Sequence, residues 1–226
     1  MPRHRHATAP VTARTWWIAS LFLVGSLCFA VGPVPAVVRW LGPRGDSMVY
    51  VVGAVFFTCA AALSLLDVVD GGHGRGVDGR RPDRTWWQPR SSDWWADGVQ
   101  LVGTLAFNVT TTAALVENWT VRQQNVRVWG PDVVGSVCFL VSSGIAMSAA
   151  AAVGRRFRAD DTAWWVAAFN LAGSVAFGLS ALGAFVLPST GSLAAPRLDA
   201  LGTSVGGVCF LVASVLLVPQ AKEVGT

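Results

Sequence analysis

Hydrophobic residues dominate six long stretches of the chain, and the charged residues fall between these stretches. Each stretch lacks Asp, Glu, Lys and Arg and has about the 20 residues that a helix needs to cross the hydrocarbon of a bilayer. The fifth stretch is longer because it includes a loop with Pro188 and Pro196. Since lipid cannot satisfy the backbone of an open sheet edge, we expect helices in all six stretches. They cover residues 15–38, 47–66, 98–116, 133–154, 162–196 and 200–221.

This pattern predicts an all-α polytopic membrane protein with six transmembrane helices. The odd-numbered helices share a signature, in which a pair of Trp residues is followed by Gly eight positions after the second Trp. The Trp pairs are Trp16–Trp17, Trp94–Trp95 and Trp164–Trp165, and the glycines are Gly25, Gly103 and Gly173. The even-numbered helices share another signature, found as VGAVFFTCAA at 52–61, VGSVCFLVSS at 134–143 and VGGVCFLVAS at 205–214.

The two signatures indicate three copies of one two-helix unit. Two helices per unit return the chain to the same side of the membrane, so the repeats are expected to be parallel. The predicted organisation is a basic arm at 1–14, repeat 1 at 15–70, an Arg/Gly-rich loop at 71–92, repeat 2 at 93–154, a short loop at 155–161 and repeat 3 at 162–221.

Composition agrees with a membrane protein. Of the 226 residues, 53% are hydrophobic and only 13% are charged, too few charges to coat a soluble domain of this size. The net charge is +4, and all but one of the 17 positively charged residues are Arg. These Arg residues lie in short blocks between apolar stretches, which is typical of residues that orient a protein in the membrane rather than of a nucleic-acid-binding surface. Twelve of the 17 Lys and Arg residues fall on the side that holds both termini. We therefore expect both termini in the cytoplasm.

The recurring motifs resemble a known family. The segment GSLCF at 25–29, the partner segment VGSVCFLVSS and the Trp pairs are similar to the YrhK-like domain of bacterial membrane proteins, in a triplicated form like that of actinobacterial proteins. The resemblance implies a helical protein of the bacterial plasma membrane. It implies no activity, because the matching residues are packing and interface residues.

One helix carries a polar row that the others lack. Asp97, Gln100, Thr104, Asn108 and Thr111 are spaced by three or four residues and therefore share one face of a helix. Polar groups at membrane depth face the bundle interior or a wet cavity. We interpret the row as hydrogen bonding between helices, and a solute or ligand pathway is the alternative.

The candidate binding residues are Gln100, Thr104 and Asn108, with Asn170 as the expected partner of Gln100 because Asn170 stands at the matching position of the third repeat. No His lies in the six stretches, and the four Cys residues are not spaced as metal ligands. We therefore expect no enzyme activity, no metal and no cofactor.

The sequence thus favours a non-enzymatic helical bundle, with a small-solute transporter or channel as the alternative. The lipid bilayer is the expected partner. The spacing of Gly202 and Gly206 matches a GxxxG packing motif, which serves packing within the chain or in a homo-oligomer.

The charge distribution makes a testable prediction about topology. A single Cys introduced into the 71–90 segment should react with a membrane-impermeant maleimide only after the cytoplasmic side is exposed, because Arg-rich loops stay inside. Labelling in intact cells and in inside-out vesicles measures this. Reaction in intact cells would reverse the assigned orientation.

Overall fold

The computed structural model describes residues 13–70, 86–152 and 162–218. In these ranges the regular structure is helical apart from one β-bridge between Val186 and Leu193. The elements are α1 (Ala13–Val31), α2 (Pro35–Val69), α3 (Ser92–Ala113), α4 (Val121–Gln124), the π-helix η1 (Asn125–Trp129), α5 (Gly130–Ala152), α6 (Thr162–Gly183) and α7 (Pro196–Leu217). The predicted 1–14 arm, 71–92 loop and 155–161 loop lie largely outside the described residues.

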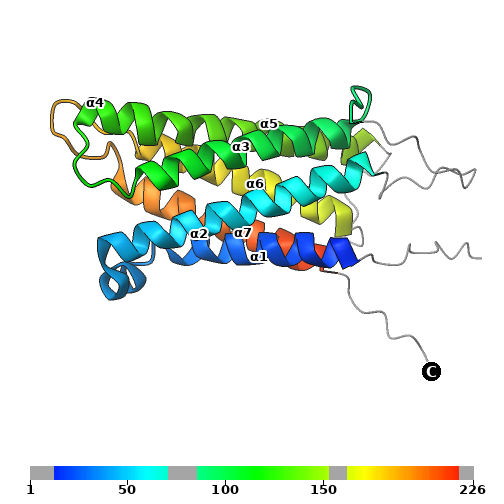
Figure 1. The fold of residues 1–226 in the computed structure, drawn as a ribbon, viewed down its shortest axis with the longest axis horizontal. Coiled ribbons are helices and arrows are strands. Elements are labelled where there is room, and N and C mark those ends of the chain that lie inside the picture. The colour runs from blue at the N-terminus through cyan, green and yellow to red at the C-terminus, as the bar shows by residue number, and fades with distance from the viewer. Residues whose placement is uncertain (1–12, 71–85, 153–161, 219–226) are drawn as a thin grey trace, which may run out of the picture.

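The long helices run along one axis (Figure 1), and their packing forms a closed ring. Each packs against the next in the order α1, α2, α3, α5, α6 and α7, and α7 packs back against α1. The turns from α1 to α2, from α3 to α4 and from α6 to α7 lie at one end, which we call the hairpin end (Figure 1). Helices α1, α3 and α6 all begin at the opposite end, which we call the terminal end, so all three Trp pairs lie there.

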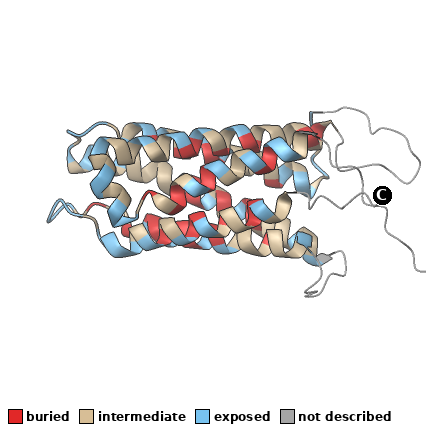
Figure 2. Ribbon diagram, turned by 90° about the horizontal axis from the view of Figure 1, so that it is seen from below, coloured by how far each residue is buried: buried red, intermediate tan, exposed pale blue. Residues whose placement is uncertain are grey.

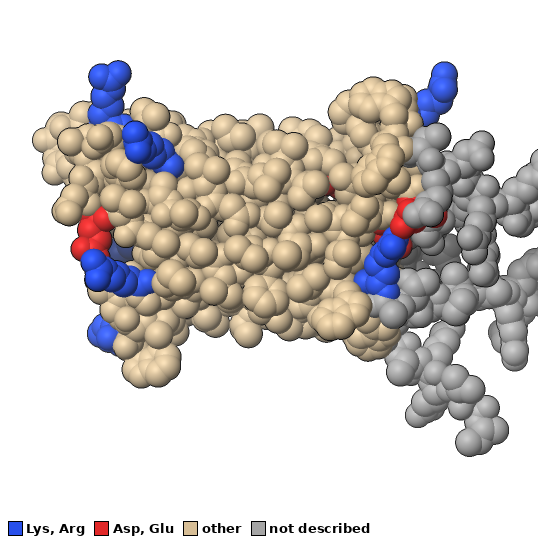
Figure 3. Space-filling model, in the orientation of Figure 1, with Lys and Arg blue, Asp and Glu red and all other residues tan. Residues whose placement is uncertain are grey.

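The exterior of the bundle is that of a membrane protein. Five helical segments are long and apolar enough to cross a bilayer, namely α1, α2, the continuous segment from α4 to α5, α6 and α7. On the face shown in Figure 3, the charged side chains gather at the two ends, and the middle of the molecule is almost free of charge. Large apolar side chains such as Leu105 and Val109 are more than half exposed on the outside. The predicted all-helical, membrane-type fold is confirmed at this level.

Helix α3 is not among these five segments. Asp93, Asp97, Gln100, Asn108 and a run of three Thr residues make it the most polar of the long helices. Its 22 residues are nevertheless enough to match its neighbours in length.

The predicted stretch 15–38 is wrong at its C-terminal end. Helix α1 stops at Val31, a turn follows, and α2 begins at Pro35. Proline is favoured at the first position of a helix, because the N–H of that residue would form no hydrogen bond within the helix. Helix α2 also breaks at Gly42, where a φ of 70° suits glycine, directly before Pro43. A hydropathy count cannot find this boundary, because the turn residues themselves are uncharged.

The interior combines aromatic rings with small polar side chains. Buried and exposed residues alternate along each helix, which gives every helix an inner and an outer face (Figure 2). Ser26, Thr104 and Ser174, each one position after a glycine of the Trp–Gly signature, are 0% exposed. The centre is a cluster with one Phe from each long helix, which we call the phenylalanine septum: Phe29, Phe57, Phe107, Phe139, Phe177 and Phe210.

Glycines make room for these rings in a reciprocal way. A methyl group added to Gly103 of α3 would lie 2.8 Å from the Phe139 ring of α5, and one added to Gly135 of α5 would lie 3.0 Å from the Phe107 ring of α3. The same exchange occurs between α1 and α2 and between α6 and α7, at the positions that match in sequence. Each ring thus fills the space that a missing Cβ leaves on the neighbouring helix.

The seam that closes the ring is also glycine-dependent. A methyl group on Gly207 of α7 would overlap the backbone of Ala30 in α1. Gly202 and Gly206 of the GxxxG motif pack against α6 of the same chain, where added methyl groups would meet Ser180 and Phe177. These small residues therefore serve packing within the chain.

The reciprocal fit generates a prediction with an internal control. Gly103→Ala should lower the free energy of unfolding by about 1–3 kcal/mol, because the new methyl group overpacks the core against Phe139 and Cys138. Gly98→Ala, on the same helix, meets nothing within 4 Å and should not destabilise. Unfolding by SDS in mixed micelles, followed by circular dichroism, compares the two variants. Equal stability of both would contradict the proposed packing.

Candidate functional site

The phenylalanine septum separates two cavities inside the bundle. Its rings form two triangles: Phe29, Phe107 and Phe177 have ring centroids 5.5–6.5 Å apart, and Phe57, Phe139 and Phe210 have centroids 5.6–6.1 Å apart. The first triangle lines a cavity of about 340 Å³ toward the hairpin end. The second lines a cavity of about 180 Å³ toward the terminal end.

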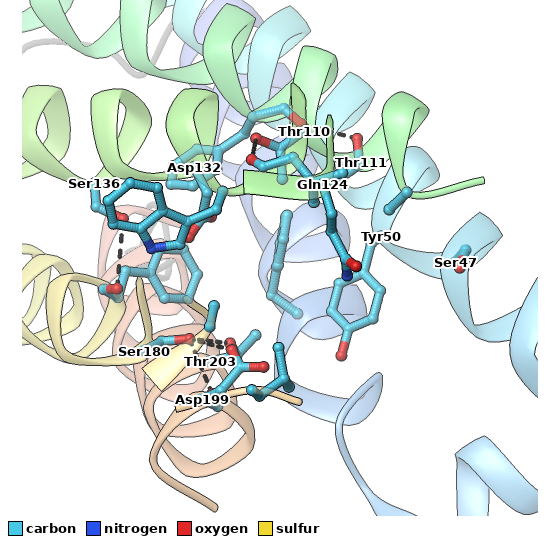
Figure 4. Close-up of a pocket in the computed structure, with 18 of the residues that line it drawn as sticks. Ser47, Tyr50, Thr110, Thr111, Gln124, Asp132, Ser136, Ser180, Asp199 and Thr203 are labelled. Carbon is cyan, nitrogen blue, oxygen red and sulfur yellow. Dashed lines mark hydrogen bonds between the residues drawn. The ribbon is translucent and has the colours of Figure 1, made fainter. Parts of the chain in front are cut away.

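The hairpin-end cavity is rich in acidic and hydroxyl groups. Three carboxyl groups line it, those of Asp46 from α2, Asp132 from α5 and Asp199 from α7. Figure 4 shows Asp132, Asp199 and Tyr50 around the same space, each from a different element. The hydroxyl groups of the lining belong to Ser47, Tyr50, Thr110, Thr111, Ser136, Ser180 and Thr203.

Most of these hydroxyl groups are engaged within the bundle. Thr111 donates to the Phe107 carbonyl at 2.9 Å, and Thr110 donates to the Val128 carbonyl at 3.0 Å. The Ser180 hydroxyl lies 2.8 Å from Asp199 Oδ1 and 2.7 Å from Thr203 Oγ1 (Figure 4). Asp199 is therefore held in place by its neighbours.

The other two carboxyl groups are not held in this way. Within the described residues, the Asp132 carboxyl forms no side-chain hydrogen bond or ion pair. Asp46 Oδ1 is buried without a hydrogen-bond partner. The described ion pairs connect other residues: Arg14 with Asp67 and Asp70 at the terminal end, and Arg44 with Glu117 on the outside of the hairpin end. The cavity thus has an acidic lining without a described basic partner.

A π-helical turn shapes one wall of this cavity. In η1 the Gly130 N–H bonds to the Asn125 carbonyl five residues earlier, and Pro131 next in the chain has no N–H to continue the α-helical pattern. The turn places Val128 and Trp129 in the lining, and the Trp129 Nε1 donates to the Ala181 carbonyl of α6 at 2.9 Å. The indole is therefore fixed as a rigid wall between α5 and α6.

The same turn fastens the loop after α6. Asn125 Nδ2 donates to the Val186 carbonyl at 2.8 Å, and the Val186 N–H donates back to Asn125 Oδ1 at 3.0 Å. Ala184 and Leu193 of this loop also line the cavity. One asparagine side chain thus attaches the loop between α6 and α7 to the π-helical wall.

The structure divides the predicted polar row between two roles. Gln100 and Asn170, predicted as partners, line the same terminal-end cavity, with Asp97, Ser64 and the α5 serines nearby. Gln100 Oε1 lies 3.5 Å from the Ser142 hydroxyl, and no hydrogen bond joins Gln100 to Asn170 among the described residues. These two amides leave polar surface facing the cavity.

Thr104 and Asn108 instead lie in the helix packing. Thr104 is buried and donates to the Leu101 carbonyl of its own helix at 2.8 Å. Asn108 donates to Thr58 Oγ1 of α2, with the Ala54 and Thr104 carbonyls also within 3.4 Å. Asn108 therefore connects α3 to α2 at the level of the septum, as the hydrogen-bonding interpretation expects.

The three carboxyl groups were missed in the sequence because they stand at the ends of the uncharged stretches. A count from charge to charge treats such residues as boundaries. One signal was present: Asp46 and Asp199 each lie six residues before the Val-Gly pair of their helices, Val52-Gly53 and Val205-Gly206. Nothing in the sequence indicated that Asp132 would share a cavity with them.

Comparisons with protein-family models, with curated proteins and with solved structures gave no match to this chain. The resemblance to the YrhK-like domain therefore remains a prediction.

The role of Asn108 can be measured by a double-mutant cycle with Thr58. Asn108→Leu and Thr58→Val should each destabilise the protein, and their coupling energy should be about 0.6–1.7 kcal/mol, the range for hydrogen bonds between membrane helices. Val109→Leu, next to Asn108 but exposed, is the control that should change little. Additive effects of the two substitutions would show that this bond contributes nothing.

Proposed function

We propose that this protein is a non-enzymatic, six-span protein of the bacterial plasma membrane that provides a pathway for small solutes along its central axis. One observation carries the proposal: two cavities with polar linings lie on opposite sides of a single aromatic constriction within a closed ring of helices. Both termini are in the cytoplasm in this proposal, in line with the Arg distribution. The hairpin-end cavity is then the outer one.

Three parallel two-helix repeats are part of the proposal. Their support is that residues matched in sequence also make matched contacts: each pair of neighbouring helices α1–α2, α3–α5 and α6–α7 exchanges Gly and Phe in the same way. Helix α3 is the sixth span, since it lies between α2 and α5 in the ring. A ring of equivalent units surrounds an axis, and an axis through a membrane protein is where a pathway can form.

Helix α3 reaches both cavities. The two ends of its polar row reach different cavities, with Asp97 and Gln100 lining one and Thr111 lining the other. Between them the row crosses the septum, where Thr104 is buried. The polar residues at the two ends of α3 thus line the proposed path, whereas Thr104 and Asn108 between them are engaged in helix packing.

The septum explains how such a path would be closed. Rings packed at centroid distances of 5–6.5 Å leave no continuous polar route between the cavities. Hydrophobic constrictions of this kind gate by excluding water. The alternative is a helical bundle that conducts no solute. The hydrogen bonds that engage Thr104 and Asn108 within the packed helices favour this alternative.

Flux through proteoliposomes separates the two functions. Purified protein should carry at least one of Na⁺, K⁺, choline and glycerol, and Phe57→Ala should raise the flux by about ten-fold or more because it removes a ring from the constriction. Phe56→Ala is the matched control, since Phe56 is the adjacent residue of α2 but belongs to neither cavity lining. Both variants are first checked for a monodisperse peak in detergent.

Absence of flux for every solute, in the wild type and in folded Phe57→Ala, would overturn the pathway and leave the packing function. Equal gains in Phe56→Ala and Phe57→Ala would also overturn it, because the gain would then reflect general loosening of the bundle.

A further inference from the structure

The hairpin-end cavity contains acidic groups that lack a partner of opposite charge. Asp46, Asp132 and Asp199 come from three different helices, and no described Lys or Arg forms an ion pair with any of them. Carboxylates inside a membrane protein are costly unless a cation or hydrogen-bond donors compensate them. Asp199 has Ser180 as a donor, whereas Asp132 has no such donor among the described residues.

Asp132 is the group that points most clearly to a ligand. Asp132 is half-buried, and it lines the cavity. Its position at the start of α5 is fixed by the π-helical turn and by Pro131 before it. A rigidly placed carboxylate that faces an internal space, with no partner in the protein described, is suited to hold a positively charged group.

The geometry does not suit a metal ion. Metal ions need several protein ligands within about 2.0–2.6 Å. Among the described residues, no group of three His, Cys, Asp or Glu side chains converges closely enough to hold one. The three carboxyl groups are instead distributed around a space of about 340 Å³, near the lower end of the volumes typical of small-ligand sites.

Aromatic rings make up much of the remaining wall. Tyr50 and Trp129 line the sides of the cavity, and the rings of Phe29, Phe107 and Phe177 form its floor at the septum. The faces of aromatic rings attract cations, and cages of such rings recognise quaternary ammonium groups. The carboxylates supply negative charge around the cavity without converging on one point, and the aromatic rings supply an apolar wall. This combination favours a bulky, weakly hydrated cation over a small, strongly hydrated one.

We propose that the hairpin-end cavity binds a small organic ammonium ion, with Asp132 as the main counter-charge, Asp46 and Asp199 as secondary charges, and Tyr50 and Trp129 as aromatic walls. This inference rests on the proposed pathway, for which it names the class of solute. The binding itself needs no movement of the septum, so it can be tested without flux.

Choline and its neutral carbon analogue 3,3-dimethylbutan-1-ol provide the test, since they have almost the same shape and differ in charge. Binding of each to the purified full-length protein in detergent is measured by isothermal titration calorimetry. Choline should bind at least ten-fold more tightly than the neutral analogue. Asp132→Asn should weaken choline binding at least ten-fold, whereas Asp93→Asn, an exposed carboxyl at the terminal end, should leave it unchanged.

A second pair of variants separates the aromatic wall from simple folding defects. Tyr50→Leu should weaken choline binding, and Tyr50→Phe should restore it, because only the ring face is needed. Equal binding of choline and the neutral analogue, full choline affinity in folded Asp132→Asn, or displacement of choline by micromolar Mg²⁺ or Ca²⁺ would overturn the proposal. Absence of choline binding would overturn it as well.

The outcomes distinguish this inference from the pathway. Choline binding without flux of any solute would support the cation site and contradict the proposed pathway. If glycerol flux is observed and increases in Phe57→Ala, but choline does not bind, the pathway would be supported and the cation site would be contradicted.

Discussion

The fit between glycine and phenylalanine on facing helices is the interaction on which the rest of this structure depends. In lipid, helices gain no hydrophobic driving force from contact with one another, so association relies on close packing and on hydrogen bonds. Gly103 and Gly135 let α3 and α5 approach, and the Phe107 and Phe139 rings then occupy the surface that the missing side chains leave free. The same fit in the other two pairs of helices brings six rings to one level of the bundle.

The two cavities follow from this arrangement of rings. The bulky side chains of the interior are concentrated at the septum, and the buried side chains beside them are small, such as Ser26 and Ser174. Toward the hairpin end and toward the terminal end, the spacing between the helices is still set by the glycines and rings of the septum. Fewer large side chains fill the space between the helices there. Polar side chains of α2, α3, α5 and α7 line it instead.

Much of this could be predicted from sequence, because uncharged length and Trp and Gly spacing are local signals. The helices were accessible in this way, and so was the repeated Trp and Gly spacing that places Gly25, Gly103 and Gly173 at matching positions. The partnership predicted between Gln100 and Asn170 is not seen as a hydrogen bond among the described residues, where Gln100 contacts Ser142 instead. The turn at 32–34 was not accessible, since Gly32 and Pro33 are as uncharged as their neighbours. The acidic cavity was not either, because Asp46, Asp132 and Asp199 meet only after the ring closes and the π-helical turn sets the start of α5.

Closure of the ring between the first and last helices has a consequence for biosynthesis. Helix α1 leaves the ribosome well before α7, so the surface around Ala30 that Gly207 contacts has no partner from α7 until that helix is inserted. Until then the bundle is an open arc, and Phe57 lacks the contact that the Phe210 ring of α7 later makes with it. The ring of helices is thus closed only in one late step of assembly, and a chain that ends before α7 leaves it open.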